Sequence, residues 1–292
     1  MWLDIYNQSS PAVLSSLDVN KASGPDEIPA RTLKETAREI DPSLCDLFNK
    51  LLRLGSLPTE WKLANIVPVY KKENKEYIEN YPPISLLCLV SKVMERCLFN
   101  AIKDQFYILV GSCQHGFMAK RSCVTQLVEV YCLIGSQLDK GGQVDFIFLD
   151  FSKAFDKVSH RKLLTLLQEH GFGGNLLAWF DFYLQNRLQR VTALVVSSEA
   201  LPVTSWVPQG SILGPMLFLF YANSLPDVVK SSRVSTFADD TKIFKTIVTQ
   251  EDSSLVKADL RNLASWSYSV GPAFNKSKIN VKCSGWLESS IL

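Results

Sequence analysis

The chain has 292 residues, of which 47% are hydrophobic and 21% are charged, and its formal net charge is +2. This composition excludes an intrinsically disordered chain, and the length suffices for one large domain or two small ones. The mild basic excess neither demands nor excludes a nucleic-acid partner. The N-terminal residues lack the basic-then-apolar pattern of a signal peptide. The most apolar run, residues 212–222, is shorter than the roughly 20 residues of a membrane span, so no transmembrane segment is expected.

The first half of the chain is predicted to be mainly helical. Apolar residues at helical spacing predict a helix that begins at Asp41-Pro42 and is stopped by Gly55. A short strand that runs into a basic turn is predicted over residues 63–72. Long amphipathic helices are predicted over residues 84–106 and 122–142.

The second half mixes strands and helices without a strict alternation. The predicted strands cover residues 143–151, 187–198, 201–210 and 273–283, with a hairpin over 233–247. The predicted helices cover residues 160–170, 175–186, 211–229 and 252–266. This order predicts the α+β class.

Two acidic sites lie within these strands. Asp239 and Asp240 are adjacent in the predicted hairpin, where a tight turn brings both carboxylates to one edge. Asp150 ends the apolar strand, where burial requires a partner. Mg²⁺ takes oxygen ligands, and two such ions can clamp the attacking and leaving oxygens of a phosphoryl transfer. Simpler interpretations remain open, namely a helix N-cap for Asp150 and an ordinary turn for the pair.

The order of several motifs indicates a family. The stretches FLDFSKAFDKVSH, VPQGSILGPMLFLFYANSLP and FADDTKIF resemble, in this order, the reverse transcriptase domain of non-LTR (LINE-type) retrotransposons. Upstream, KASGPDEIPA, VPVYKKENKEYIENYPPISLL and CQHGFMAKRSC resemble the fingers motifs of the same family. Downstream, AFNKSKI is similar to its lysine-bearing motif. The resemblance extends from Val13 to Lys278.

The resemblance implies a right-hand polymerase with fingers and palm, an antiparallel palm sheet packed on helices, and a thumb that is largely absent. It implies a leader over residues 1–20, a fingers-like region over 21–140, a palm-like region over 141–282 with finger insertions near 160–200, and a degraded tail over 283–292. The implied function is RNA-directed DNA polymerase activity in retrotransposition. Its partners would be an RNA template, a DNA primer and dNTPs, in an intracellular setting, nuclear or cytoplasmic.

The resemblance also assigns residue roles. It implies Asp150, Asp239 and Asp240 as ligands of two Mg²⁺ ions, with Mn²⁺ as a substitute, and Lys278 as a proton donor to the pyrophosphate leaving group. Phe155 would be the gate against a 2′-hydroxyl. Beside the nucleotide and template would lie Gln209, Gly210, Lys71 and Lys72. Each of these residues has a simpler interpretation: a core aromatic, a Pro-Gly turn, or solvated lysines.

The sequence departs from the family pattern at two positions where the family has arginine. Pro82 stands in NYPPISL where the family has arginine, which removes five donors and a charge. Met118 also replaces an arginine. With the expected loss of the thumb, these changes suggest a partly degraded domain. The alternative function is therefore an inactive remnant that at most binds nucleic acid.

Overall fold

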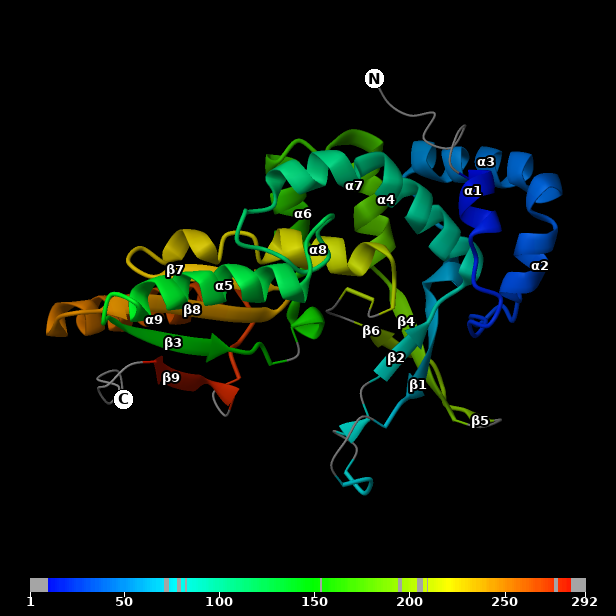
Figure 1. The fold of residues 1–292 in the computed structure, drawn as a ribbon. Helices are drawn as coiled ribbons and strands as arrows, with labels where there is room; N and C mark the ends of the chain where they lie inside the picture. Colours follow the sequence, from blue (N-terminus) through cyan, green and yellow to red (C-terminus); the bar gives the residue numbers. More distant parts are fainter. Residues whose placement is uncertain are drawn as a thin grey trace. The chain divides into compact units, whose positions relative to one another are not determined.

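The computed structural model describes residues 10–70, 74–77, 80–81, 83–152, 154–193, 196–203, 207–208, 210–275 and 278–284. The chain forms two compact units. Unit 1 comprises residues 1–105 and 159–217, and unit 2 comprises residues 106–158 and 218–292. Helices and strands interleave along the chain (Figure 1), and in each unit strands form a sheet. This confirms a mixed α and β fold.

Unit 1 contains a sheet built from two distant parts of the sequence. β1 (Leu63–Pro68) pairs antiparallel with β2 (Pro83–Leu86) and parallel with β4 (Arg187–Ala193). β4 also pairs antiparallel with β5 (Val196–Ser197) and β6 (Leu201–Val203). The strand predicted after the first helix is confirmed. The predicted strand pair is confirmed in part, because β4 and β6 pair but β6 is much shorter than the predicted strand over residues 201–210.

The helices of unit 1 surround a core rich in aromatic side chains. They are α1 (Ser10–Ser15), α2 (Ala30–Glu35), α3 (Ala37–Leu54), the 3-10 helix η1 (Thr59–Lys62), most of α4 (Leu89–Leu109), α6 (His160–Glu169), α7 (Gly174–Leu184) and the start of α8 (Leu213–Tyr221). Trp179 and Tyr183 of α7 are fully buried and stack on each other. α3 ends at Leu54 and is stopped by Gly55 as predicted, where a φ of 60° favours glycine.

The predicted start of the first long helix is wrong. α3 begins at Ala37, and Pro42 lies inside it. Proline removes one backbone hydrogen bond from the helix. The buried face of α3, which includes Phe48 and Leu52, outweighs this local cost because packing supplies most of the stability of a helix in a protein.

The predicted start of the second long helix is also wrong. Residues 84–86 belong to β2, and α4 begins only at Leu89. β2 pairs with β1 in the register Asn65↔Leu86. Local apolar spacing does not reveal this pairing, because strand formation depends on a partner elsewhere in the chain.

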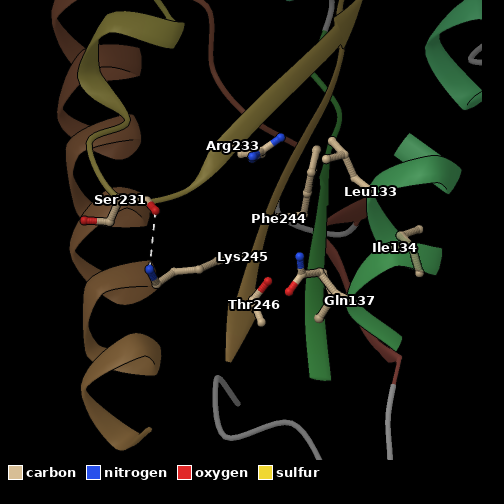
Figure 2. Close-up of a pocket in the computed structure, with 9 residues that line it drawn as sticks. Leu133, Ile134, Gln137, Ser231, Arg233, Phe244, Lys245 and Thr246 are labelled. Atoms are coloured by element: carbon tan, nitrogen blue, oxygen red, sulfur yellow. Dashed lines mark hydrogen bonds between the residues drawn. The ribbon is translucent and has the colours of Figure 1, made fainter. Parts of the chain in front are cut away.

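Unit 2 is built on a four-stranded antiparallel sheet. Its order is β7 (Arg233–Phe237), β8 (Asp240–Ile247), β3 (Gln143–Leu149) and β9 (Asn280–Ser284). α5 (Cys123–Leu138) and α9 (Gln250–Val270) contact this sheet, and Figure 2 shows the strands between the two helices. The 3-10 helices η3 (Phe155–Lys157) and η4 (Pro226–Val228) and the end of α8 complete the unit. The predicted hairpin is confirmed, and so are the two predicted helices that contact the sheet, α5 and α9.

Neighbouring residues of β8 face opposite helices. Phe244 packs with Val130 of α5 in a small core, beside a cavity of about 220 Å³ (Figure 2). Lys245 points the other way, and its Nζ lies 3.3 Å from an Asp252 oxygen in α9. Asp252 also caps α9, and the backbone N–H groups of Val248 and Thr249 hold its pKa at about 2. The sheet is thus fixed on both faces.

Candidate active site

The three acidic residues singled out in the sequence come together at one end of the sheet in unit 2. In the hairpin, Phe237 pairs with Asp240, so Ala238 and Asp239 form a two-residue turn. β8 pairs with β3 through Leu149↔Thr241, and Asp150 follows β3 directly. The antiparallel register therefore brings Asp150 next to Asp240. The predicted turn at Asp239 and the predicted strand that ends near Asp150 are confirmed.

A lysine completes this group of charges. Lys278 lies just before β9, and its Nζ is 2.8 Å from an Asp150 oxygen. Its hydrogen bond to Asp150, together with the charges of Asp150, Asp240 and Asp239, raises the pKa of Lys278, so this side chain is protonated at neutral pH. Asp150 contacts Lys278 instead of capping a helix, because the following α-helix, α6, begins only at His160.

The pKa of Asp239 is raised. Burial is the main cause, and the negative charges of Asp240 and Asp150 add to it. The nearby Lys278 acts in the opposite direction without cancelling the effect. A cation placed here would relieve the repulsion between the acids.

An open cavity of about 320 Å³ lies at the same place. Its lining includes Asp150, Asp240, Lys278 and Lys242. Burial lowers the pKa of Lys242. Two carboxylates and two amines thus face a space large enough for a phosphate group and water.

The oxygen atoms of these carboxylates suit magnesium only if water and substrate supply its other ligands. Among the described residues, no three or more His, Cys, Asp or Glu side chains lie close enough to hold a metal ion by themselves. Mg²⁺ does not need such an enclosure, because it commonly binds one or two carboxylates and takes its other ligands from water and substrate phosphates. The oxygen chemistry of the group and the repulsion on Asp239 both suit such a cation.

The other predicted site residues lie elsewhere or outside the described part. Phe155 begins η3, and its ring stacks on Phe218 with a centroid distance of 4.7 Å. It therefore packs against a core aromatic residue of the same unit. Gly210 belongs to unit 1, where its φ is 112° and a Cβ would come within 2.6 Å of the Ser85 carbonyl oxygen. Lys71, Lys72, Gln209 and the altered position Pro82 lie outside the described residues.

Sequence reasoning assigned no role to Gln114, a polar residue near Asp239 and Asp240. Gln114 is buried, and its amide forms hydrogen bonds with both backbone groups of Ala238, the residue before Asp239. The motif CQHGF contains this glutamine and is the only signal for it in the sequence. The motif does not reveal the contact with Ala238, because the two residues are 124 positions apart.

The chain resembles known proteins along most of its length. The model of the family "Reverse transcriptase (RNA-dependent DNA polymerase)" matches residues 70–287. The chain is 30% identical over 272 residues, 90% of its length, to a probable RNA-directed DNA polymerase from transposon X-element of Drosophila melanogaster, and covers 30% of that protein. It is 29% identical over 79% of its length to the RNA-directed DNA polymerase from mobile element jockey of the same species, and covers 26% of it.

A third relative is a putative 115 kDa protein in the type-1 retrotransposable element R1DM of Drosophila melanogaster, 27% identical over 91% of the chain. These matches show that the chain belongs to the reverse transcriptase family, with relatives in non-LTR retrotransposons. Enzymes of this family generally use divalent metal ions. The chain spans about 30% of the length of the curated relatives it matches. Among the described residues, none of the helices has both the length and the apolar character needed to cross a bilayer.

Proposed function

We propose that this chain is the polymerase domain of a non-LTR retrotransposon protein and extends a DNA primer on an RNA template with dNTPs. The observation that supports this most directly is the convergence of Asp150, Asp239 and Asp240 with Lys278 at one end of an antiparallel sheet. In this proposal the sheet of unit 2 is the palm of a right-hand polymerase. The sheet of unit 1 and its helices belong to the fingers.

The three carboxylates would hold two Mg²⁺ ions, for which Mn²⁺ can substitute. When bound there, the ions would lower the pKa of the primer 3′-hydroxyl and neutralise the charge of the triphosphate and of the departing pyrophosphate. The chain's own contribution would be to fix the carboxylate oxygens at the ends of paired strands and in the turn between two of them, so that the hydroxyl and the α-phosphate of the dNTP meet in line. The oxygen–phosphorus bond to the primer would form as the bond to pyrophosphate breaks, and the proton of the 3′-hydroxyl would pass to solvent water.

Lys278 is proposed as the proton donor to the pyrophosphate. Its Nζ carries a proton at neutral pH, and more than half of its side chain is exposed, so it can turn from Asp150 toward a phosphate. Phe155 is proposed as the side chain that packs against the sugar and disfavours a 2′-hydroxyl. Lys71, Lys72, Gln209 and Gly210 are proposed to bind the triphosphate, the incoming base or the template.

Primer extension tests this proposal. Purified chain would be given an RNA template, an annealed DNA primer and either dNTPs or NTPs, with Mg²⁺ or Mn²⁺. Extension with dNTPs that disappears in Asp240→Asn would support it. The matched control is Asp104→Asn, since Asp104 is an exposed aspartate of α4.

The same assay separates the alternative function. Folded wild-type chain that binds the primer–template without extending it would mean an inactive remnant that binds nucleic acid. The substitutions at Pro82 and Met118 favour that outcome, because each replaces a cation of the family pattern. Restoring arginine at position 82 should then raise incorporation, and no rise would remove this explanation for lost activity.

A further inference from the structure

The side-chain amide of Gln114 forms two hydrogen bonds with the backbone of Ala238, the residue that precedes Asp239 and Asp240. The Ala238 N–H donates to Gln114 Oε1 at 2.8 Å, and Gln114 Nε2 donates to the Ala238 carbonyl at 3.2 Å. The N–H of Gly116 donates to the same Oε1 at 2.7 Å. Both atoms of one side-chain amide are therefore used, and the backbone of Ala238 is held from two sides.

Ala238 adopts a conformation that alanine resists. Its φ is 55°, in the left-handed region, at the first position of a two-residue hairpin turn where glycine is preferred. For an alanine this conformation costs about 1–2 kcal/mol. Two net hydrogen bonds of about 1 kcal/mol each are enough to offset that cost. Without them, the turn that carries Asp239 would be free to adopt other conformations.

Gln114 itself is fixed by its neighbours in unit 2. The N–H of His115 donates to the Thr236 carbonyl at 2.8 Å, and the N–H of Thr236 donates to the Cys113 carbonyl at 2.9 Å, which attaches this segment to the end of β7. Arg121 Nη1 donates to the Gln114 carbonyl. A Cβ on Gly116 would lie 2.2 Å from the Ala238 nitrogen, so only glycine allows this close approach. These contacts fix the backbone around Gln114, and therefore the position of its side-chain amide.

We propose that Gln114 is a positioning residue, whose amide holds the Ala238–Asp239 turn so that the Asp239 carboxylate points toward the metal ions and the substrate. The effect on catalysis rests on the proposed function, whereas the effect on the turn does not. Groups that orient a metal ligand from behind change affinity or activity by about 10–100-fold when they are removed.

The test uses two substitutions that differ in what they retain. Gln114→Met keeps the length of the side chain and removes all three hydrogen bonds. Gln114→Glu keeps an acceptor for the two N–H groups and loses only the donor to the Ala238 carbonyl. Gln168→Met is the matched control, because Gln168 is an exposed glutamine of α6.

The first readout needs no catalysis. We expect hydrogen exchange of the Ala238 amide, followed by NMR, to become at least about tenfold faster in Gln114→Met, to stay near the wild-type rate in Gln114→Glu, and not to change in Gln168→Met. Mn²⁺ titration, read from broadening of the same resonances, should show weaker binding in Gln114→Met. Unchanged exchange and unchanged Mn²⁺ binding in Gln114→Met would overturn the proposal.

The second readout is kinetic. In Gln114→Met the kcat of single-nucleotide extension should fall about 10–100-fold, with a higher Mg²⁺ requirement and little change in the KM for dNTP. Adding Ala238→Gly should recover part of the loss, because glycine adopts a positive φ without help. A loss that follows the melting temperature instead, with no recovery by glycine, would mean a merely structural role. A wild-type chain that never extends a primer would refute the polymerase function while hydrogen exchange still decides the role of Gln114.

Discussion

At the residue scale, Asp239 has a raised pKa, chiefly because of burial. A raised pKa means that the ionised form is disfavoured in the folded chain. At pH values below about 4 the group is protonated in both the folded and the unfolded state, and this cost disappears. As the pH rises through the folded-state pKa, the carboxylate ionises and stability is lost. Metal binding, which needs the ionised form, should therefore fall as the pH is lowered toward that pKa.

Removing the charge of Asp239 should therefore lower activity and raise stability. Asp239→Asn should abolish primer extension and, without divalent ions, raise the melting temperature at pH 7 by a few degrees, about what a gain of 1 kcal/mol produces in a chain of this size. The gain should shrink as the pH approaches 4. Calorimetry would measure it, with Asp104→Asn as control. A lower melting temperature for Asp239→Asn would contradict this account.

Lys278 leads to a second prediction at this scale. In the proposed function its ammonium group would compete with metal ions for Asp150, which its Nζ contacts at 2.8 Å. Because Lys278 is largely exposed, the ion pair contributes at most about 1 kcal/mol. Lys278→Met should therefore bind Mn²⁺ about two- to fivefold more tightly, a factor of five being about 1 kcal/mol, while kcat for extension falls.

The control for Lys278 is Lys162→Met, which removes an exposed lysine of α6. Isothermal titration would give the Mn²⁺ affinity and single-turnover extension the rate. Affinity and rate that both fall in Lys278→Met would mean that this lysine holds the site together and does not compete with the metal. The pKa of Lys278 is raised by its partners, so the competition should persist throughout the neutral range.

At the element scale, the start of α8 depends on a buried carboxylate. Glu95 of α4 accepts hydrogen bonds from the N–H groups of Ile212 and Leu213, at 2.8 and 3.2 Å. Burial raises the pKa of Glu95, while the positive charge of Arg187 acts against that rise. Acidic groups are favourable at helix N-termini, and here the bonds fix the segment that follows Gly210.

Removing this cap should be costly. Glu95→Ala leaves two buried N–H groups without an acceptor and Arg187 without its nearby negative charge, so we expect a loss of about 3–5 kcal/mol in the free energy of unfolding. Glu95→Gln, which keeps an acceptor, should lose less. Urea denaturation would measure both, with Glu199→Ala, at an exposed loop glutamate, as the control near zero. Equal losses for Ala and Gln would contradict the capping role.

Local patterns predicted the elements near the acids better than those near the N-terminus. The strand before Asp150 and the hairpin around Asp239 were predicted correctly, because β-rich residues with a clear turn between them leave few alternatives. The helix starts near Pro42 and Ile84 were not, because burial and strand pairing decided them. The bonds of Gln114 to Ala238 could not be predicted, since they depend on how distant segments pack.

At the scale of the whole molecule, chain order and spatial grouping differ. Unit 1 contains two separate stretches of the sequence, and so does unit 2. α4 and α8 each cross from residues of one unit to residues of the other. Asp150 and Asp239 are 89 positions apart in the sequence yet belong to one unit, because β3 pairs with β8. A site read from single motifs therefore becomes one site only through the fold.

The net charge of +2 sets the last prediction, which concerns nucleic-acid binding by the whole chain. So small a charge gives little long-range attraction, so affinity for a primer–template must come from local contacts with phosphates. Each neutralised phosphate should lower the binding constant about 3.5-fold between 50 and 200 mM salt, and four contacts would lower it about 150-fold. Fluorescence anisotropy with a labelled RNA–DNA hybrid would measure this slope. Asp239→Asn should keep both affinity and slope while it loses extension, because in the proposed function its carboxylate would bind metal and would not contact the template. Binding that is indifferent to salt would mean that base stacking or apolar contacts, not phosphate contacts, hold the hybrid.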